Sequence, residues 1–168
     1  MGTTETGTAR EVVAEYFDAL GEQDMDRAVA QWKPGSIDHL FGFGDLIAPD
    51  GIHDYFTNVF ASVPDFRFEV RAMVAENNRV AVHWHASGIF SGSEKFQGLT
   101  PNGRAIRLEG CDLLTVEDGK IVSNDAYTNG MEFARQVGAL PPADSAQERA
   151  MTAAFNARTA LIKRFRRH

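Results

Sequence analysis

Hydrophobic residues in the first third of the chain recur at intervals of three and four, the spacing that buries one face of a helix. Thr8 and Glu11 form a capping box before the first such segment, and Gly21 follows its last apolar residue. A second, shorter segment carries Trp32 and is expected to stop at Pro34. The sequence predicts helices over residues 8–21, 24–33 and 49–63, and a short strand or hairpin over residues 36–47.

From Phe66 onward the pattern changes to every second residue, which is typical of a strand with one buried face. The turns at residues 77–78 and 118–119 are short enough to join only antiparallel neighbours. The sequence predicts strands over residues 66–74, 80–86, 106–116 and 120–127, and helices over residues 131–137 and 145–165. Helices followed by an antiparallel sheet predict an α+β fold, with helices over one face of a curved sheet.

The composition fits one globular domain, because the 168 residues are 43% hydrophobic and 24% charged. No apolar run approaches the ~18 residues that suggest a membrane span. The net charge of −6 opposes binding to nucleic acid or to anionic lipid, so neither partner is expected. Cys111 is the single cysteine and no secretory leader pattern is recognisable, which predicts a cytoplasmic location.

The second half of the chain carries three short motifs, LEGCD at residues 108–112, VEDGKIV at 116–122 and QVG at 136–138. Together with residues 32–60 and 80–103, they resemble the SnoaL-like polyketide cyclases of the nuclear-transport-factor-2-like superfamily. The resemblance runs from about residue 8 to 142 and implies a cone-shaped curved antiparallel sheet packed against N-terminal helices. We therefore expect a SnoaL-like domain at residues 1–142 and a C-terminal helical extension at residues 143–168.

The resemblance also implies where reactive groups would lie. In cyclases of this type an aspartate just after the last strand acts as the base, seven residues before the glutamine of the QVG-like ending. Counting back from Gln136 gives Asn129, whose amide can orient a carbonyl but cannot take a proton at neutral pH. Many relatives carry a histidine where this chain has Phe90, a candidate for substrate binding. The superfamily includes cyclases, a steroid isomerase, epoxide hydrolases, dehydratases and proteins with no known reaction, so the fold leaves function open.

Asp112 is the most informative charged residue, because its parity places it on the same face as Leu108, Leu114 and Val116. A carboxylate on a buried face is costly unless it is hydrogen-bonded or used in chemistry. Desolvation would raise its pKa, which suits a catalytic acid or base near neutral pH. The alternative is a purely structural acceptor of hydrogen bonds.

Asp125, Tyr127 and Asn129 share one face of the last strand and its end, and the resemblance places that face inward. Asp125 would then be a second catalytic acid or base, while Tyr127 and Asn129 would bind the substrate and stabilise an oxyanion. The alternative is that Asp125 and Asn124 only shape the end of the strand.

Three further residues are candidates for the pocket wall. His39 would face the cavity if Phe41 does, and Trp32 and Tyr55 could line it with their polar tips. For each of the three the alternative is an ordinary place in the core.

The histidines of the sheet occupy its predicted outer face. His83 and His85 alternate with apolar residues and have no zinc-type ligands spaced around them, so no metal is expected. With Met73, Leu113 and neighbouring charges they would form a surface of mixed polarity. We expect this surface to form a homodimer.

The final helix, predicted over residues 145–165, carries an apolar stripe that includes Met151, Phe155, Ile162 and Phe165. Isolated helices are marginal, so this face should pack on its own domain, on the pocket mouth or on the partner subunit. A basic helix on a membrane surface is the alternative, although the basic residues at 163–167 also suit a helix C-terminus.

The sequence contains no phosphate loop, dinucleotide fingerprint or nucleophile elbow, so any chemistry is expected to need no cofactor. As an enzyme, the protein would perform acid–base chemistry on a small apolar molecule: cyclisation, isomerisation, dehydration or epoxide opening. The alternatives are a non-catalytic module that binds a small ligand and a structural dimer whose pocket is filled by side chains.

Overall fold

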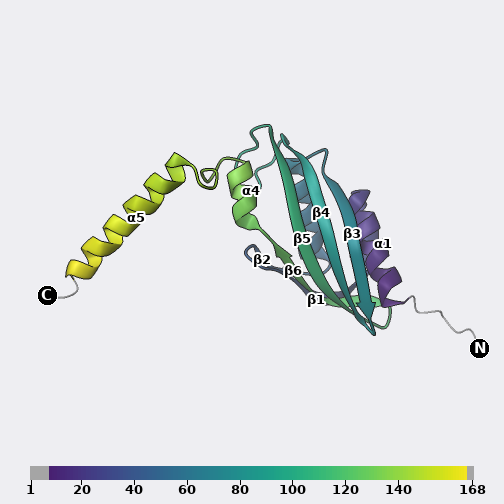
Figure 1. The fold of residues 1–168 in the computed structure, drawn as a ribbon. Coiled ribbons are helices and arrows are strands. Elements are labelled where there is room, and N and C mark those ends of the chain that lie inside the picture. Colours follow the sequence, from purple (N-terminus) through teal and green to yellow (C-terminus); the bar gives the residue numbers. More distant parts are fainter. Residues whose placement is uncertain (1–7, 166–168) are drawn as a thin grey trace, which may run out of the picture.

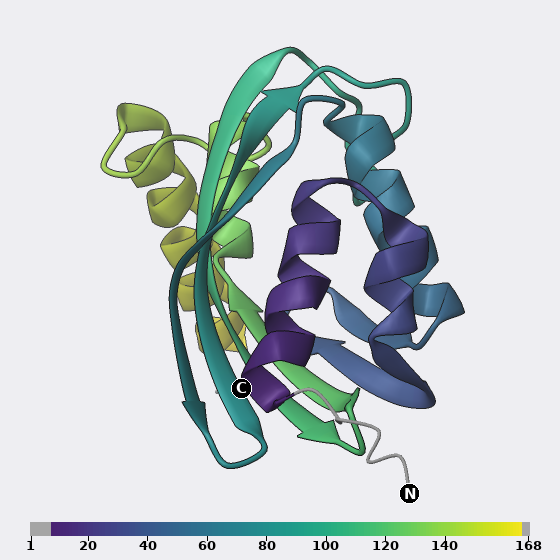
Figure 2. The same cartoon turned by 90° about the vertical axis from the view of Figure 1, so that its right-hand side faces the viewer.

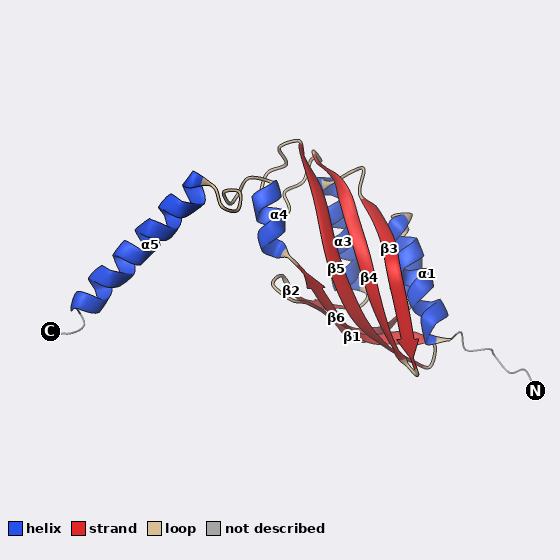
Figure 3. Ribbon diagram, viewed as in Figure 1, coloured by secondary structure: helices blue, strands red, loops and turns tan. Residues whose placement is uncertain are grey.

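The structure is a computed structural model and describes residues 8–165. Its centre is a six-stranded curved sheet with the order β2-β1-β6-β5-β4-β3 (Figure 1, Figure 3). The strands are β1 (Trp32–Leu40), β2 (Gly44–Ile47), β3 (Arg67–Glu76), β4 (Arg79–Phe90), β5 (Arg104–Glu117) and β6 (Lys120–Thr128). Neighbouring strands are antiparallel except β1 and β6, which run parallel. The predicted α+β fold with a curved sheet is confirmed.

Three helices, α1 (Ala9–Gly21), α2 (Met25–Ala30) and α3 (Asp50–Ser62), lie on one side of the sheet (Figure 2). The capping box of α1 forms, because Thr8 Oγ1 accepts a hydrogen bond from the Glu11 amide at 3.3 Å and Glu11 Oε2 accepts one from the Thr8 amide at 2.7 Å. The apolar stripe of α1, which includes Val13 and Tyr16, is buried. The core therefore lies between these helices and the sheet.

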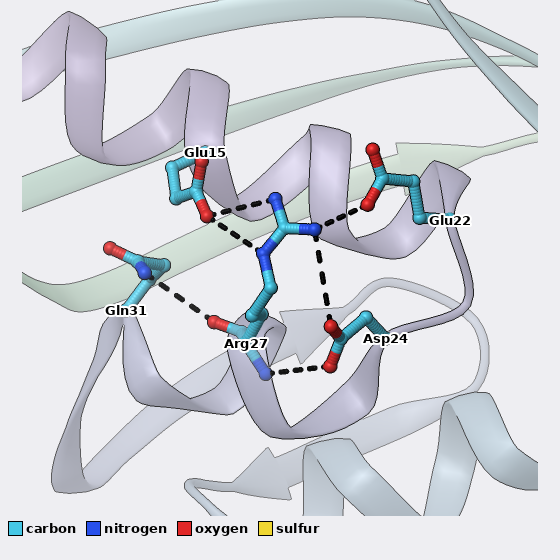
Figure 4. Close-up of polar contacts among 5 residues, drawn as sticks. All are labelled: Glu15, Glu22, Asp24, Arg27 and Gln31. Carbon is cyan, nitrogen blue, oxygen red and sulfur yellow. Dashed lines mark hydrogen bonds and ion pairs between the residues drawn. The ribbon is translucent and has the colours of Figure 1, made fainter.

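Arg27 links the short helix α2 to α1 through hydrogen bonds and ion pairs (Figure 4). Its guanidinium donates to Glu15 Oε1 from Nε at 3.0 Å, and its Nη1 contacts Glu22 at the end of α1. The Arg27 amide donates to Oδ1 of Asp24, the N-cap of α2, at 3.1 Å. These contacts are partly exposed, so they orient the two helices more than they add to stability.

The second helix is shorter than predicted, because α2 ends at Ala30 and Trp32 is the first residue of β1. Trp32 pairs with Ile121 of β6, and pairing resumes only at Ile37. Pro34 falls in this irregular stretch, where it has no amide hydrogen to give to a neighbouring strand. The proline expected to end a helix therefore interrupts a strand pairing.

A bulge in β3 reverses the expected positions of the last side chains of this strand. Val70 pairs with Trp84, and Ala72 pairs with His83, which leaves one extra residue between them on β3. Beyond the bulge Met73 packs against the core, while Val74 is 69% exposed. The prediction that Met73 belongs to the outer face is therefore wrong.

The QVG motif holds helix α4 (Gly130–Gln136) on β5. Gln136 Oε1 accepts a hydrogen bond from the Arg107 amide at 2.7 Å, and Gln136 Nε2 donates to the Arg107 carbonyl at 2.8 Å. Val137 is buried, and its carbonyl accepts a hydrogen bond from Asn102 Nδ2 at 2.8 Å. The motif therefore fixes the position of α4 after the last strand.

The predicted final helix is present as α5 (Ala146–Phe165). It extends away from the sheet beyond α4 (Figure 1), and none of its described residues is buried. Among residues 8–165, no helix is long and apolar enough to cross a membrane.

Candidate functional site

A cavity of about 100 Å³ lies between the sheet and the helices. One water needs only ~10–15 Å³ of such space, so the cavity has room for a small molecule. Its wall is mainly apolar and rich in aromatic rings, which include Phe17, Phe43, Phe56, Phe68, Phe96 and Phe133. Two carboxyl groups, those of Asp38 and Asp112, interrupt this apolar wall.

The two carboxyl groups are joined by one amide. Asp38 on β1 and Asp112 on β5 are 1% and 6% exposed. Asn124 lies on β6, the strand between them, and its Nδ2 donates to Asp38 Oδ1 at 3.0 Å and to Asp112 Oδ2 at 2.8 Å. The strand order therefore brings together three polar residues that are far apart in the sequence.

Trp84 supplies a second donor to Asp112, since its Nε1 lies 2.8 Å from Asp112 Oδ1. The indole has room because Trp84 pairs directly with Gly110 of β5. A Cβ atom at position 110 would lie 2.0 Å from Trp84 Cζ2. The glycine of the LEGCD motif is therefore required by the packing of Trp84.

Burial raises the pKa of both carboxyl groups. For Asp112 desolvation raises the pKa to about 6, against the opposing effect of the hydrogen bonds from Trp84 and Asn124. For Asp38 desolvation and then the nearby Asp112 raise the pKa well above its usual range, against one hydrogen bond from Asn124. Because Asp112 accepts the larger number of hydrogen bonds, the negative charge is favoured there and the proton on Asp38. Two titratable groups whose surroundings favour the proton on one and the charge on the other are typical of catalytic acid–base pairs.

Two phenols lie near this cluster. Tyr16 on α1 is 1% exposed, and burial, followed by the charges of Asp38 and Asp112, raises its pKa well above the usual range. Tyr55 on α3 lines the cavity, and burial and Asp38 raise its pKa. Both phenols therefore remain neutral at physiological pH.

The structure distributes the sequence-predicted pocket residues unevenly. Asp112 and Tyr55 line the cavity. Trp32 and Phe90, 3% and 0% exposed, do not line it and are packed in the core. His39 follows the inward-facing Asp38 and has the opposite parity, so its Nδ1 instead lies 2.9 Å from Oδ1 of the exposed Asp45. The pocket assignments of Trp32, Phe90 and His39 are thereby corrected.

The face of β6 that points to the cavity is the opposite of the expected one. Thr115 of β5 pairs with Ser123 and Val116 pairs with Ile121, so β6 has one extra residue there and its parity shifts. Asn124 consequently points inward and is 1% exposed.

The same shift places Asp125 and Tyr127 on the outer face, where Tyr127 is 51% exposed and stacks on Phe41. Asn129 is the N-cap of α4, since its Oδ1 accepts a hydrogen bond from the Glu132 amide at 3.1 Å. Asp125, Tyr127 and Asn129 therefore do not join Asp112 in the cavity.

Sequence reasoning missed Asp38 and Asn124 as site residues. Asp38 alternates with Leu40, which also lines the cavity, but the strand was too irregular for its parity to be assigned. Trp84 shared the predicted inner face with Val82 and Ala86, yet nothing in that pattern indicates that its indole reaches a carboxylate.

Together, the curved sheet covered by helices and its cavity with two acidic residues are typical of one class of small α+β proteins. Residues 10–137 match the family model of the SnoaL-like polyketide cyclases. The chain therefore belongs to this family. No curated protein sequence matches it.

Solved structures share the fold. AclR from Streptomyces galilaeus has a TM-score of 0.69 and 19% identity, with 95% of this chain and 97% of that chain covered. TsrD from Streptomyces laurentii has a TM-score of 0.69 and 17% identity, with coverage of 83% and 100%. A SnoaL-like polyketide cyclase from Agrobacterium tumefaciens has a TM-score of 0.62 and 23% identity, with coverage of 79% and 99%. At these identities the matches show the fold alone.

Proposed function

We propose that the protein binds a small, largely apolar carbonyl compound in its cavity and catalyses proton transfer on it without a cofactor. The observation that carries this proposal is the pair of buried carboxyl groups, Asp38 and Asp112, in a largely apolar wall. Burying two such groups costs free energy, and a role in chemistry accounts for that cost.

The different surroundings of the two carboxyl groups support different roles for them. Asp112, stabilised as the carboxylate by Trp84 and Asn124, is the base that removes a proton from a carbon next to the carbonyl. Asp38, whose pKa burial and then the nearby Asp112 raise well above its usual range, is the acid that gives its proton to the carbonyl oxygen. The C–H bond breaks, an enol forms, and the proton count on the two aspartates is unchanged in total.

The enol then leads to one of two products. If it attacks a second carbonyl of the same molecule, a new C–C bond closes a ring, and Asp112 returns its proton to the new alkoxide. If the compound carries a C=C bond next to the deprotonated carbon, the enol is a dienol, and its reprotonation at the far end by Asp112 moves the double bond, which is isomerisation. In both cases the enol O–H returns its proton to Asp38 as the carbonyl re-forms.

The cavity wall indicates the kind of molecule that fits. Rings such as those of Phe68, Phe96 and Phe133 favour a flat apolar body, while the carboxyl groups require one polar end. Epoxide opening is compatible with the same pair, with Asp38 protonating the epoxide oxygen and Asp112 activating water.

A ligand-binding protein without turnover is the second candidate. The observation that favours it is Asn129, which stands at the position of the family's base and serves as a helix cap. Asp38 and Asp112 would then only bind the polar end of the ligand.

Mass spectrometry of small molecules retained through native purification would identify candidate ligands for turnover assays. Replacing Asp112 with Asn should lower turnover of such a ligand by about 10²-fold or more, with binding retained. Asp125→Asn is the matched control, because Asp125 lies on the opposite face and is the smallest of the causes that shift the pKa of Asp38, so its loss should change turnover far less. Binding of the ligand without turnover by the wild-type protein would favour the second candidate.

A further inference from the structure

Helix α5 presents apolar side chains that no described residue covers. Met151, Phe155, Ile162 and Phe165 are between 42% and 72% exposed. Their spacings of three, four and seven place them on one side of the helix. A helix with such a stripe gains most of its stability from packing, so this face requires a partner surface.

Several polar contacts hold the N-terminal end of α5 against α4. Arg135 of α4 forms an ion pair with Glu148 in the first turn of α5, and both side chains are largely shielded from solvent. Glu148 Oε2 also accepts a hydrogen bond from the Asp144 amide at 2.6 Å, and Ser145 Oγ accepts one from the Glu148 amide at 3.1 Å. These contacts direct α5 away from its own sheet (Figure 1), so its own sheet does not provide the partner surface.

The outer face of the sheet carries an exposed apolar band. The strand register aligns Val74, Ala81 and Leu113 in one row, which continues to Asp125, and places Cys111 between His83 and Tyr127 in the next. Phe41 extends the second row, since its ring stacks on that of Tyr127 with 4.5 Å between the centroids. Val74, Phe41 and Tyr127 are 69%, 49% and 51% exposed, and Cys111 is exposed as well.

The length of α5 matches the width of the sheet, and its net charge is opposite to that of the rest of the chain. A helix of 20 residues is about 30 Å long, which is enough to cross six strands spaced about 4.8 Å apart. Residues 143–168 contain six Lys or Arg and two Asp or Glu, a net charge of +4, which leaves −10 on residues 1–142. Association of α5 with the remainder of another molecule is therefore electrostatically favourable.

We propose that α5 of one molecule lies across the outer sheet face of a second copy, whose own α5 returns the contact. Reciprocal exchange uses the same two surfaces twice and gives a closed twofold dimer. The match to AclR covers 95% of the 168 residues and leaves about eight unmatched, so that structure has a counterpart of much of α5, whereas TsrD is matched over its full length with 83% of this chain.

The native Cys111 provides a direct test, since it is the only cysteine and lies on the proposed docking face. Three variants of the full chain, Met151→Cys, Phe155→Cys and Ile162→Cys, sample positions along the apolar stripe. Under mild oxidation at least one should form a disulfide-linked dimer on a non-reducing gel, because a disulfide requires Cα atoms within about 7 Å. These positions are exposed in the single chain, so the variants should fold normally.

Ala153→Cys, on the opposite side of α5, is the matched control and should remain monomeric on the gel. Adding Cys111→Ser to a positive variant should abolish the linked dimer. If the linked dimer persists after that change, α5 pairs with α5 of the other copy. If the oxidised protein is a monomer without free thiols, the disulfide is internal and α5 docks on its own sheet. Either result overturns the proposal. Sedimentation as a monomer at micromolar concentration, with or without binding to vesicles of phosphatidylcholine and phosphatidylglycerol, also overturns it.

Discussion

The indole of Trp84 reaches diagonally across the sheet to Asp112. Trp84 pairs with Gly110, and Asp112 pairs with Val82, yet Trp84 Nε1 lies 2.8 Å from Asp112 Oδ1 because no side chain at position 110 stands between them. This contact supplies one of the hydrogen bonds that stabilise the Asp112 carboxylate in an apolar cavity. The proposed base therefore depends on a tryptophan and on a glycine of the neighbouring strand.

Trp84→Phe should raise the pKa of Asp112, because phenylalanine keeps most of the ring but has no N–H to donate. A hydrogen bond to a charged group contributes about 1.5–3 kcal/mol, which corresponds to about one to two pH units. The acidic limb of the pH–rate profile of kcat/KM should move to higher pH by about this amount. An unshifted limb would show that the indole does not tune the base.

Asp38→Asn should remove the proposed acid without displacing the base. Asp38 is neutral when Asp112 ionises, and its charge is not among the causes that shift the pKa of Asp112. We expect a fall in kcat of about 10²-fold or more with an acidic limb at unchanged pH. A shift of that limb to lower pH, with kcat retained, would mean that Asp38 only repels Asp112.

Gly110→Ala should be strongly destabilising, since the added Cβ would lie 2.0 Å from the Trp84 ring. Overpacking of this kind costs about 1–3 kcal/mol or more in the free energy of unfolding. Gly21→Ala is a suitable control, because its nearest neighbour would be the Phe68 carbonyl oxygen at an ordinary 3.5 Å. Urea unfolding of both variants checks the expectation, and equal stability of the two would contradict it.

The stability of the protein should depend on the ionisation of Asp112. Its pKa is about 6 in the folded state and about 3.9 in an unfolded chain, so folding favours the protonated form. The resulting stabilisation is complete below pH ~4 and is lost as the pH rises through ~6, for a total of about 3 kcal/mol. In the Asp38→Asn background, where one buried carboxyl group remains, unfolding should be compared with and without Asp112→Asn between pH 4 and 8. A difference in unfolding free energy that does not change with pH would contradict the assigned pKa.

The sequence predicted which segments form helices and strands better than it predicted which face of a strand each side chain occupies. Capping boxes, turn sequences and hydrophobic periods are local signals, and they located α1, α5 and the long strands. Bulges are not local signals: the extra residues in β3 and β6 moved Met73 inward and Asp125 outward, because one inserted residue exchanges the two faces of a strand.

The candidate site was predicted only in part for a related reason. Asp112 lies on a regular stretch of β5, where simple alternation holds up to its cavity position. Asp38 and Asn124 lie beside irregular pairings, and their meeting with Asp112 depends on the strand order β1-β6-β5. That order includes a parallel pair between distant strands, which no short motif specifies.

The most direct test of the proposed acid–base pair is a carbon-13 NMR titration of the aspartate carboxyl groups in the wild-type protein, with Asp38→Asn and Asp112→Asn used to assign the two signals. We predict that Asp112 titrates near pH 6 and that Asp38 remains protonated above that pH, since it has fewer stabilising donors and lies beside the charged Asp112. Titration of both groups near the ordinary aspartate value of about 3.9 would contradict the account.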